Sequence, residues 1–202
     1  GRFAPAWPYN LPMAKPQGEL KRHSRVRGIE TVVGLHSVSE LAGEIERPGE
    51  GQIRALILGG GNPVSTGAEG AHLARALGEL DLLVSVDLFR RESHRDAHWL
   101  IPAVHFLERD EVHVALHSYN DLPFIQATRQ VVAPPSGVRP GWTFYRDLAA
   151  AMGTEVYGGH IRTPDELSAS MIARGGTITL DQVRAQPHGL IYGERTMGHF
   201  IA

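Results

Sequence analysis

IRALILGGGNPVST, residues 53–66, is the stretch that decides the fold of this chain. An apolar strand is expected at residues 53–58, followed by a glycine loop at 59–63 and then a helix. A second apolar strand, at residues 82–86, ends on Asp87. Near-continuous Val, Ile and Leu runs are typical of parallel strands that are buried on both faces, and a crossover helix joins such strands. The stretch therefore predicts a βαβ unit.

The two strand ends predict a nucleotide site. Ligands of open parallel sheets bind beyond the carboxyl ends of the strands, where the glycine loop and Asp87 would both lie. Glycines let the backbone approach a phosphate, and amides near a helix N-terminus complement its charge. A carboxylate accepts paired donors, such as a ribose diol or the N1/N2 edge of guanine. The alternative, which the local pattern leaves open, is a tight turn beside an Asp87 that only caps its strand.

Composition excludes several classes of protein. A chain of 202 residues, 42% hydrophobic and 21% charged, is long enough for one sizeable core, or for one domain with appendages. Its net charge of -2 gives no electrostatic reason to expect nucleic acid or an anionic membrane as a partner. No apolar run approaches the roughly 20 residues that span a bilayer, and no signal peptide is visible, so we expect a cytoplasmic location. Without cysteine, the chain supplies no disulfide, thiolate nucleophile or thiolate metal ligand.

Hydrophobic periodicity and stop signals place the remaining elements. Helices are expected at residues 37–46 and 142–152 and from residues 163 and 179, and strands at residues 99–101 and 124–132. Three helix starts carry a capping-box pattern: Ser37 with Glu40, Thr163 with Glu166, and Thr179 with Gln182. The crossover helix is expected to bury Ala71, Ala74, Leu77 and Leu80, with Leu73 beside them. The helix at 142–152 is expected to pack Phe144, Tyr145, Leu148 and Met152 inward and to stop at Gly153.

The first 28 residues hold four prolines and cannot form a regular helix or a central strand. We expect an irregular, extended proline-rich arm at residues 1–28 that lies on a neighbouring part of the protein. Its basic cluster is expected to be a solvated face, with phosphate contact as the alternative; the cluster consists of Lys21, Arg22, Arg25 and Arg27. We divide the rest into an α/β domain at residues 29–155 and a helical extension at residues 156–202.

Eleven histidines raise the question of a metal site. His113 and His117 would share a face only in a helix, and His94 and His98, with the same spacing, fall in an expected loop. No HExxH sequence occurs, so we expect ordinary histidines and no metal site made by protein ligands alone. Ser65 and Ser93 lack a nucleophile-elbow sequence, which argues against hydrolase chemistry.

Four blocks of sequence are informative through their particular residues, and not only through their hydrophobic periodicity. They read LGGGNPVST, LDLLVSVDLFRRES, AHWLIPAVHFLERD and RQVVAPPSGVRPGWTFYRDLAAAMG. In order and spacing over about residues 30–153 they resemble the molybdopterin-dependent oxidoreductases, the family that contains formate dehydrogenases, periplasmic nitrate reductases and dimethyl sulfoxide reductases. Typical members read GGNP, LDFVVVQDxFxTETA, ADVVLPAxxxxEKEG and RQAVxPPGEARPDWxIxxxLAxxLG at these places.

The resemblance implies a Rossmann-like, three-layer α/β domain, a parallel sheet with flanking helices. It also implies that this domain holds one guanosine diphosphate half of a bis-molybdopterin guanine dinucleotide cofactor. At the matching positions, the loop on the phosphate side consists of Gly60, Gly61, Asn62 and Pro63. Asp87 matches the acid that recognises guanine. The rim beside it consists of Arg91, Glu92 and Ser93.

The departures from the family pattern are informative. Ser93-His94 replaces the usual Thr-Ala, and His98 stands where the pattern has Asp, which leaves the substrate open more than the cofactor fold. Family members run to several hundred residues and add a cysteine-ligated iron–sulfur segment, a Cys, selenocysteine or Ser metal ligand, and a C-terminal pterin-binding domain. This chain therefore resembles an internal fragment or one subunit of a split enzyme, and its expected partner is the remainder of the polypeptide or a partner subunit.

The consequence for function is that the isolated chain is expected to be inactive. Catalysis in this family takes place at molybdenum or tungsten held by two pterin dithiolenes, and we assign no catalytic residue and no metal ligand to these 202 residues. Two alternatives remain open. One is a non-catalytic nucleotide-binding module, and the other is a structural or interaction domain whose proline arm binds a partner.

Overall fold

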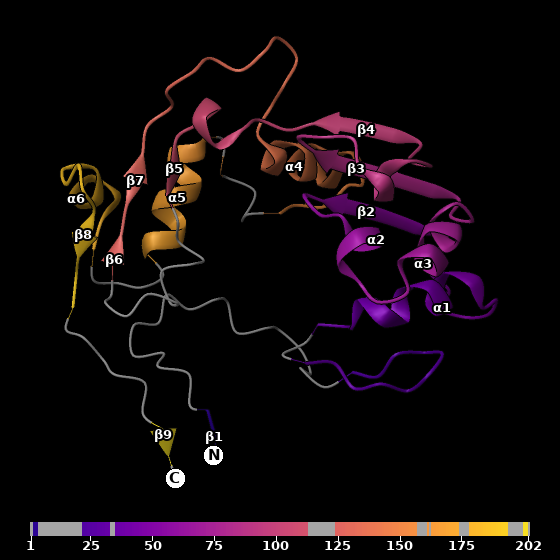
Figure 1. Cartoon of the computed structure of the whole chain (residues 1–202). Helices are drawn as coiled ribbons and strands as arrows, with labels where there is room; N and C mark the ends of the chain where they lie inside the picture. The colour runs from indigo at the N-terminus through magenta and orange to yellow at the C-terminus, as the bar shows by residue number, and fades with distance from the viewer. Residues whose placement is uncertain are drawn as a thin grey trace. The chain divides into compact units, whose positions relative to one another are not determined.

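The computed structural model describes residues 2–3, 22–32, 35–112, 124–156, 161, 163–173, 178–193 and 200–201 (Figure 1). These residues form two compact units. The first, here called the sheet unit, contains residues 22–32, 35–104 and 136–144. The second unit contains the other described residues. Both strand ends that predict the nucleotide site belong to the sheet unit.

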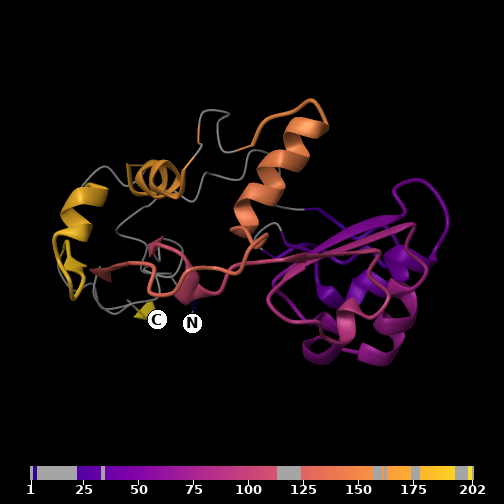
Figure 2. The same cartoon turned by 90° about the horizontal axis from the view of Figure 1, so that it is seen from above.

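A three-stranded parallel sheet is the centre of the sheet unit. Its strands β2 (Ala55–Gly59), β3 (Leu82–Asp87) and β4 (Trp99–Pro102) lie in the order β2-β3-β4. The helices α1 (Leu41–Glu46), α2 (Pro63–Thr66) and α3 (Gly70–Leu77) lie together on one side of the sheet (Figure 1, Figure 2). The predicted α/β fold, with a parallel sheet and flanking helices, is confirmed.

The crossover from β2 to β3 contains two helices instead of one. Between α2 and α3 the chain turns through Gly67, where a Cβ would lie 2.7 Å from the Pro63 carbonyl oxygen, and Glu69, whose φ is 54°. The buried stripe also differs from the prediction, because Ala71 is exposed and Ala74 is only half-buried. The core consists of Ala42, Ile45, Leu58, Leu73, Ala76, Leu77, Leu80 and Leu83.

Only the central strand is buried along most of its length. In β3, residues 83–86 are all buried, whereas Ile57 in β2 is 36% exposed and Trp99 in β4 is 64% exposed. Ile57 and Trp99 flank Val84 in register, on the face opposite the one that Leu58 and Leu83 turn to the helices. The expectation that the strands are buried on both faces is therefore wrong for the outer strands, which have a paired neighbour on one side within the described residues.

The start of α1 is held by contacts distant in sequence. Ser37 accepts from the Ser39 N–H at 3.3 Å and caps a short 3-10 helix, η1 (Val38–Glu40). Glu40 does not reach back to complete the predicted capping box with Ser37, because its buried carboxylate accepts from Ser24 Oγ at 3.0 Å and lies 2.9 Å from Arg27 Nη1. The prediction failed because tertiary partners use the carboxylate.

Arg22 and Arg27 of the basic cluster are exposed, as expected, but Arg25 is tied to α1. Arg25 donates from Nε to Glu44 at 3.2 Å and from Nη2 to the Arg47 carbonyl at 2.6 Å. The Arg25 side chain is 24% exposed, and its neighbour Ser24 is buried. Arg25 therefore does not lie on the solvated face that was expected, since it holds residues 22–32 against α1. Lys21 and the prolines of the arm lie outside the described residues.

Among the described residues, the second unit contains short strands, α-helices and a 3-10 helix, η3 (Phe106–Glu108). Its strands are β1 (Arg2–Phe3), β5 (Glu111–Val112), β6 (Phe124–Ile125), β7 (Ala127–Thr128), β8 (Leu190–Ile191) and β9 (Phe200–Ile201). They pair antiparallel as β1–β9, β5–β7 and β6–β8. The predicted strand at residues 124–132 is broken, because β6 and β7 pair with different strands on either side of Gln126 and residues 129–132 form no strand. Ile125 packs with residues of the helices into a small core that also contains Ile172, Leu180 and Val183.

The helices of the chain's C-terminal half begin and end largely as predicted. Helix α4 (Gly141–Ala151) begins in the sheet unit, continues in the second unit and ends two residues before Gly153, whose φ is 73°. Met152 is 73% exposed, so the prediction that it packs inward is wrong. The predicted capping boxes start α5 (Pro164–Ala173) and α6 (Leu180–Arg184), and both reciprocal bonds form in each. Within the described segments, every helix is too short or too polar to cross a bilayer.

The burial of β3 gives a first testable prediction. Leu83 is fully buried between the sheet and the helices, whereas its neighbour Leu82 is 40% exposed. Leu83→Ala should lower the free energy of unfolding by about 3 kcal/mol, because it removes buried apolar contacts and leaves a cavity. Leu82→Ala is the matched control and should cost less than half as much. Urea unfolding of both variants measures the difference, and equal losses would contradict the assignment of the core.

Candidate functional site

The glycine loop leaves the sheet at the end of β2. Gly60 has a φ of 67°, and its N–H donates to the Val86 carbonyl at 2.9 Å, which ties the loop to β3. A Cβ at Gly60 would meet no atom within 4 Å, so the glycine serves the left-handed backbone and not close packing. The loop is therefore open on the side where Gly60 lacks a side chain.

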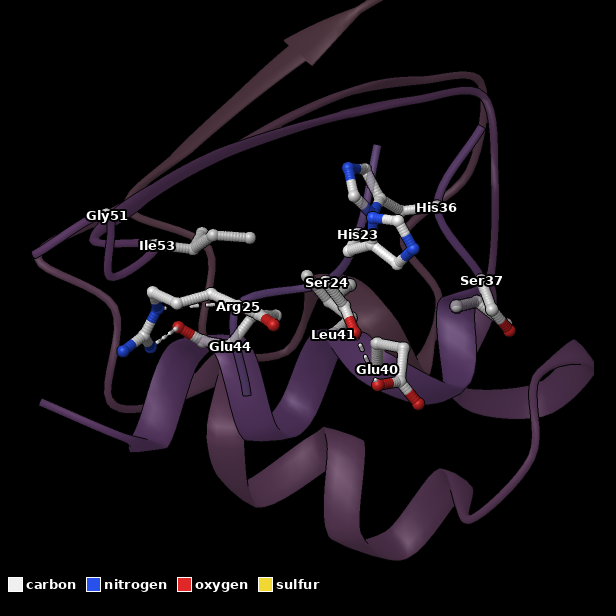
Figure 3. A pocket seen from close by; sticks show the side chains of 11 residues that line it. His23, Ser24, Arg25, His36, Ser37, Glu40, Leu41, Glu44, Gly51 and Ile53 are labelled. Carbon is white, nitrogen blue, oxygen red and sulfur yellow. Dashed lines mark hydrogen bonds and ion pairs between the residues drawn. The ribbon is translucent and has the colours of Figure 1, made fainter. Parts of the chain in front are cut away.

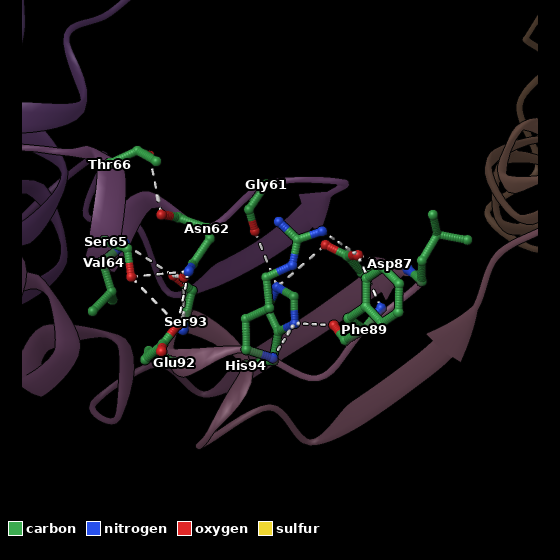
Figure 4. A network of polar contacts seen from close by, with 12 residues as sticks. Gly61, Asn62, Val64, Ser65, Thr66, Asp87, Phe89, Glu92, Ser93 and His94 are labelled. Atoms are coloured by element: carbon green, nitrogen blue, oxygen red, sulfur yellow. Dashed lines mark hydrogen bonds and ion pairs between the residues drawn. The ribbon is translucent and has the colours of Figure 1, made fainter. Parts of the chain in front are cut away.

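The side chain of Asn62 joins this loop to the segment that follows β3 (Figure 4). Its Nδ2 donates to Glu92 Oε2 at 2.8 Å and to Ser65 Oγ at 2.9 Å. Its Oδ1 accepts from Ser93 Oγ at 2.7 Å, and Ser93 Oγ in turn accepts from the Val64 N–H at 2.9 Å. The side chains of Asn62 and the buried Ser93 thus form hydrogen bonds with each other and with their neighbours. These bonds fix the backbone of the glycine loop and of the segment after β3.

Glu92 is the exposed member of this network. Its carboxylate accepts from its own backbone N–H, from the Asn62 amide and from Ser65 Oγ, and these contacts, in that order of strength, hold the pKa of Glu92 below its ordinary value. A carboxylate with a lowered pKa stabilises the fold above its unfolded-state pKa and loses that contribution as the pH falls through its folded-state pKa. Glu92 is therefore an anionic acceptor at neutral pH, beside the glycine loop.

Asp87 ends β3 and faces inward. Its side chain is 4% exposed, and Oδ1 accepts from the N–H groups of Leu88 at 2.6 Å and Phe89 at 3.2 Å and from Arg91 Nη2 at 3.2 Å. Oδ2 is buried and accepts no hydrogen bond from the part of the chain that the structure describes, and His94 Nε2 lies 3.7 Å from it. A buried carboxylate oxygen without a donor is costly, so Oδ2 is the unsatisfied acceptor of the site.

His94 also belongs to the site, although the sequence indicated only an ordinary histidine in the loop beside Asp87. It is 1% exposed and lies in the 3-10 helix η2 (Glu92–His94), in the expected loop. Its Nε2 lies 3.1 Å from the Gly61 carbonyl oxygen, and its Nδ1 lies 3.1 Å from the Phe89 carbonyl oxygen and 3.3 Å from the Arg91 backbone nitrogen, so the tautomer decides which carbonyl accepts. His94 therefore joins the glycine loop to the Asp87 side of the site. The one available signal was its departure from the alanine of the family pattern.

The structure brings the sequence-predicted site residues together at one edge of the sheet. They come from the end of β2 and the start of α2, and from the end of β3 and η2; they are Gly60, Gly61, Asn62, Pro63, Asp87, Arg91, Glu92 and Ser93. The described residues contain no group of three or more His, Cys, Asp or Glu side chains arranged to hold a metal ion. His98 accepts from the Leu83 N–H, and His113 and His117 lie outside the described residues.

A cavity of about 490 Å³ lies elsewhere in the sheet unit, between residues 22–32 and α1 (Figure 3). Its buried carboxylates, Glu40 and Glu44, are already engaged by residues of the same segment. Glu40 contacts Ser24 and Arg27, and Glu44 accepts from the Val26 N–H at 2.8 Å and from Arg25. Because residues of the chain itself compensate these charges, we do not assign a ligand to this cavity.

Comparison with known proteins decides the family. A model of the molybdopterin oxidoreductase family matches residues 10–151. The chain belongs to the molybdopterin oxidoreductase family. This confirms the resemblance of the four sequence blocks, and membership of the family implies a molybdopterin cofactor.

Individual relatives match part of the chain. It is 32% identical over 105 residues to the thiosulfate reductase molybdopterin-containing subunit PhsA of Salmonella typhimurium, covering 52% of this chain and 14% of that protein. It is 30% identical over 109 residues to the F420-dependent formate dehydrogenase 2 subunit alpha of Methanococcus maripaludis, covering 54% of this chain and 15% of that protein. These alignments thus span about a seventh of each of the two relatives.

A solved structure agrees with this result. The acetylene hydratase from Pelobacter acetylenicus is similar to the chain, with a TM-score of 0.59 and 25% sequence identity. The similarity covers 74% of this chain and 19% of that chain. The chain is therefore similar in fold, over most of its length, to part of a much larger protein.

The Asn62 network gives a second prediction. Asn62→Asp keeps the shape of the side chain but places an oxygen where Nδ2 lies 2.8 Å from the Glu92 carboxylate. Two adjacent carboxylates raise each other's pKa in the folded state, so the variant should be less stable than the wild type at pH 7 and should recover as the pH falls to about 4.5. Urea unfolding at both pH values measures the difference from the wild type.

The control for this prediction is Thr66→Val. The Thr66 hydroxyl donates to the Asn62 backbone carbonyl at 3.0 Å and does not involve a carboxylate, so its loss should have the same effect at both pH values. A stability difference for Asn62→Asp that is equally large at pH 7 and at about pH 4.5 would show that the amide does not donate to Glu92.

Proposed function

We propose that this chain is the cofactor-binding portion of a molybdopterin-dependent oxidoreductase. In this proposal its sheet unit holds one guanosine diphosphate half of a bis-molybdopterin guanine dinucleotide. The observation that carries the proposal is the convergence of two strand ends within one unit: the open loop at Gly60 and the unsatisfied Oδ2 of Asp87. Ligands of parallel sheets bind at such carboxyl ends. Membership of the family supports a molybdopterin cofactor, and the guanine dinucleotide form is part of the proposal.

The residues present suit a nucleoside diphosphate. Among the described residues, the N–H groups of Gly61 and Asn62 have no protein acceptor, so they are available to phosphate oxygens. Asp87 supplies two carboxylate oxygens at the end of the next strand, which suits the N1–H and N2–H donors of guanine. Adenine presents a different edge and would not satisfy both oxygens.

The remaining predicted residues have supporting roles in this proposal. Asn62 and Ser93 shape the two loops, because their side chains are committed to each other. Pro63 starts α2 directly after the loop, with its φ already suited to a helix. Glu92 and Arg91 line the rim, where the carboxylate of Glu92 is suited to a ribose hydroxyl.

The chemistry of the whole enzyme requires more than this chain. When bound, a molybdenum or tungsten ion on two pterin dithiolenes supplies the redox chemistry, and the protein supplies binding, orientation and electrostatics. In the proposal, residues 29–155 bind one end of the cofactor, and residues 1–28 and 156–202 flank them in the sequence. The remainder of the polypeptide or a partner subunit binds the metal-bearing end. The isolated 202 residues are then inactive.

One observation favours a competing function. Asn62, Ser93 and His94 form their hydrogen bonds with one another and with the backbone, so the two loops hold together through the protein's own contacts. Such internal contacts are sufficient for a structural domain. In that case the glycines only make a turn, and Asp87 only accepts hydrogen bonds from its own loop. A measurement of nucleotide binding distinguishes the cofactor-binding function from the structural one.

The test is calorimetry of the 202-residue chain with GDP and with ADP. We expect GDP to bind at least about tenfold more tightly than ADP, since a good bidentate pair discriminates between bases by about 1–3 kcal/mol. Asp87→Asn should abolish this preference, because one acceptor becomes a donor that faces the guanine N–H groups. Asp96→Asn, at an exposed carboxylate paired with Arg95, is the control and should leave binding unchanged. Binding of neither nucleotide would support the structural domain.

A further inference from the structure

Arg91 forms an ion pair with Asp87, the carboxylate that the proposed function assigns to guanine. Its Nη2 lies 3.2 Å from Asp87 Oδ1, and its guanidinium carbon lies 5.8 Å from the centroid of the Phe89 ring. The Arg91 side chain is 36% exposed, whereas that of Asp87 is 4% exposed. The ion pair therefore joins a buried carboxylate to a guanidinium that solvent still reaches.

A guanidinium and the Watson–Crick edge of guanine have the same donor pattern. Each presents adjacent N–H groups in one plane, and each is matched by a carboxylate. Each is also a planar group that stacks on aromatic rings, and the ring of Phe89 is 63% exposed. Arg91 thus contacts the two groups that a guanine base would use here, a carboxylate for its edge and a ring for its face.

We propose that Arg91 is an internal surrogate for the guanine base. The proposal rests on the proposed function, because it concerns the same Asp87 carboxylate. The base can pair with both oxygens of Asp87 only when the guanidinium leaves Oδ1, so in this proposal binding exchanges one planar donor for another. The affinity for guanine is then reduced by the strength of the Asp87–Arg91 pair, and Arg91 sets that affinity.

This role makes a prediction that is opposite in sign to that of an ordinary ligand contact. If Arg91 contacted the nucleotide directly, its removal would weaken binding. If it competes with the base, its removal strengthens binding. Guanosine is the best probe, because it has no phosphate and the loss of a positive charge cannot act through phosphate attraction.

The experiment is titration of the 202-residue chain with guanosine and with adenosine, followed by calorimetry or by NMR. Arg91→Thr should bind guanosine about threefold to tenfold more tightly than the wild type, the range expected for loss of a partly exposed ion pair with charge-assisted hydrogen bonds. Adenosine binding should not change. Arg91→Gln, which keeps one amide donor without the charge, should lie between the two and serves as a second variant if the threonine variant does not fold.

Arg90→Thr is the matched control. Arg90 carries the same charge in the adjacent position, but its Nη2 lies 3.5 Å from the Arg95 carbonyl, and its substitution should leave guanosine binding unchanged. Guanosine binding that is lost in Asp87→Asn but is unchanged or weaker in Arg91→Thr would overturn the surrogate role and leave the guanine site standing. No binding of guanosine by the wild type or by either Arg91 variant would overturn both.

Discussion

The side-chain amide of Asn62 is the interaction on which the geometry of the site depends. It joins residues about 30 positions apart, with Nδ2 donating to Glu92 and Oδ1 accepting from Ser93. An amide is donor and acceptor on one rigid plane, so neither a carboxylate nor an apolar residue replaces it. Through this amide the loop after β2 and the loop after β3 become one structure, and the distance from Gly60 to Asp87 is fixed.

The features of the fold that could be predicted from sequence are those with local causes. The apolar runs of β2, β3 and β4 can be recognised within each strand, and the capping boxes of α5 and α6 join residues three positions apart. The Ser37 capping box failed because Glu40 binds Ser24, 16 residues away. The long strand at residues 124–132 failed because strand pairing is decided by partners elsewhere in the chain, β5 and β8.

The site was predictable to the same extent. Strand ends carry a general rule about ligands, so the glycine loop and Asp87 could be found from their positions alone. The burial and the contacts of His94 could not be predicted, because its partner Gly61 is 33 residues away and nothing in the local sequence indicates a buried ring. Likewise, sequence places Arg91 on the rim, but only coordinates show that it contacts Asp87.

A buried carboxylate that reads a base has to be stable without that base. Removing a carboxylate from water costs several kcal/mol unless donors replace the water. Within the described residues, Oδ1 of Asp87 accepts from two backbone N–H groups and from Arg91, while Oδ2 has only the ring of His94 near it, at 3.7 Å. The protein therefore supplies enough donors to keep the strand end folded, and it leaves one oxygen unsatisfied. In the proposed function, the affinity for guanine is the difference between the interactions of Asp87 with the base and its interactions with the protein's own donors, so the residues that stabilise the carboxylate would also determine how tightly the base is held.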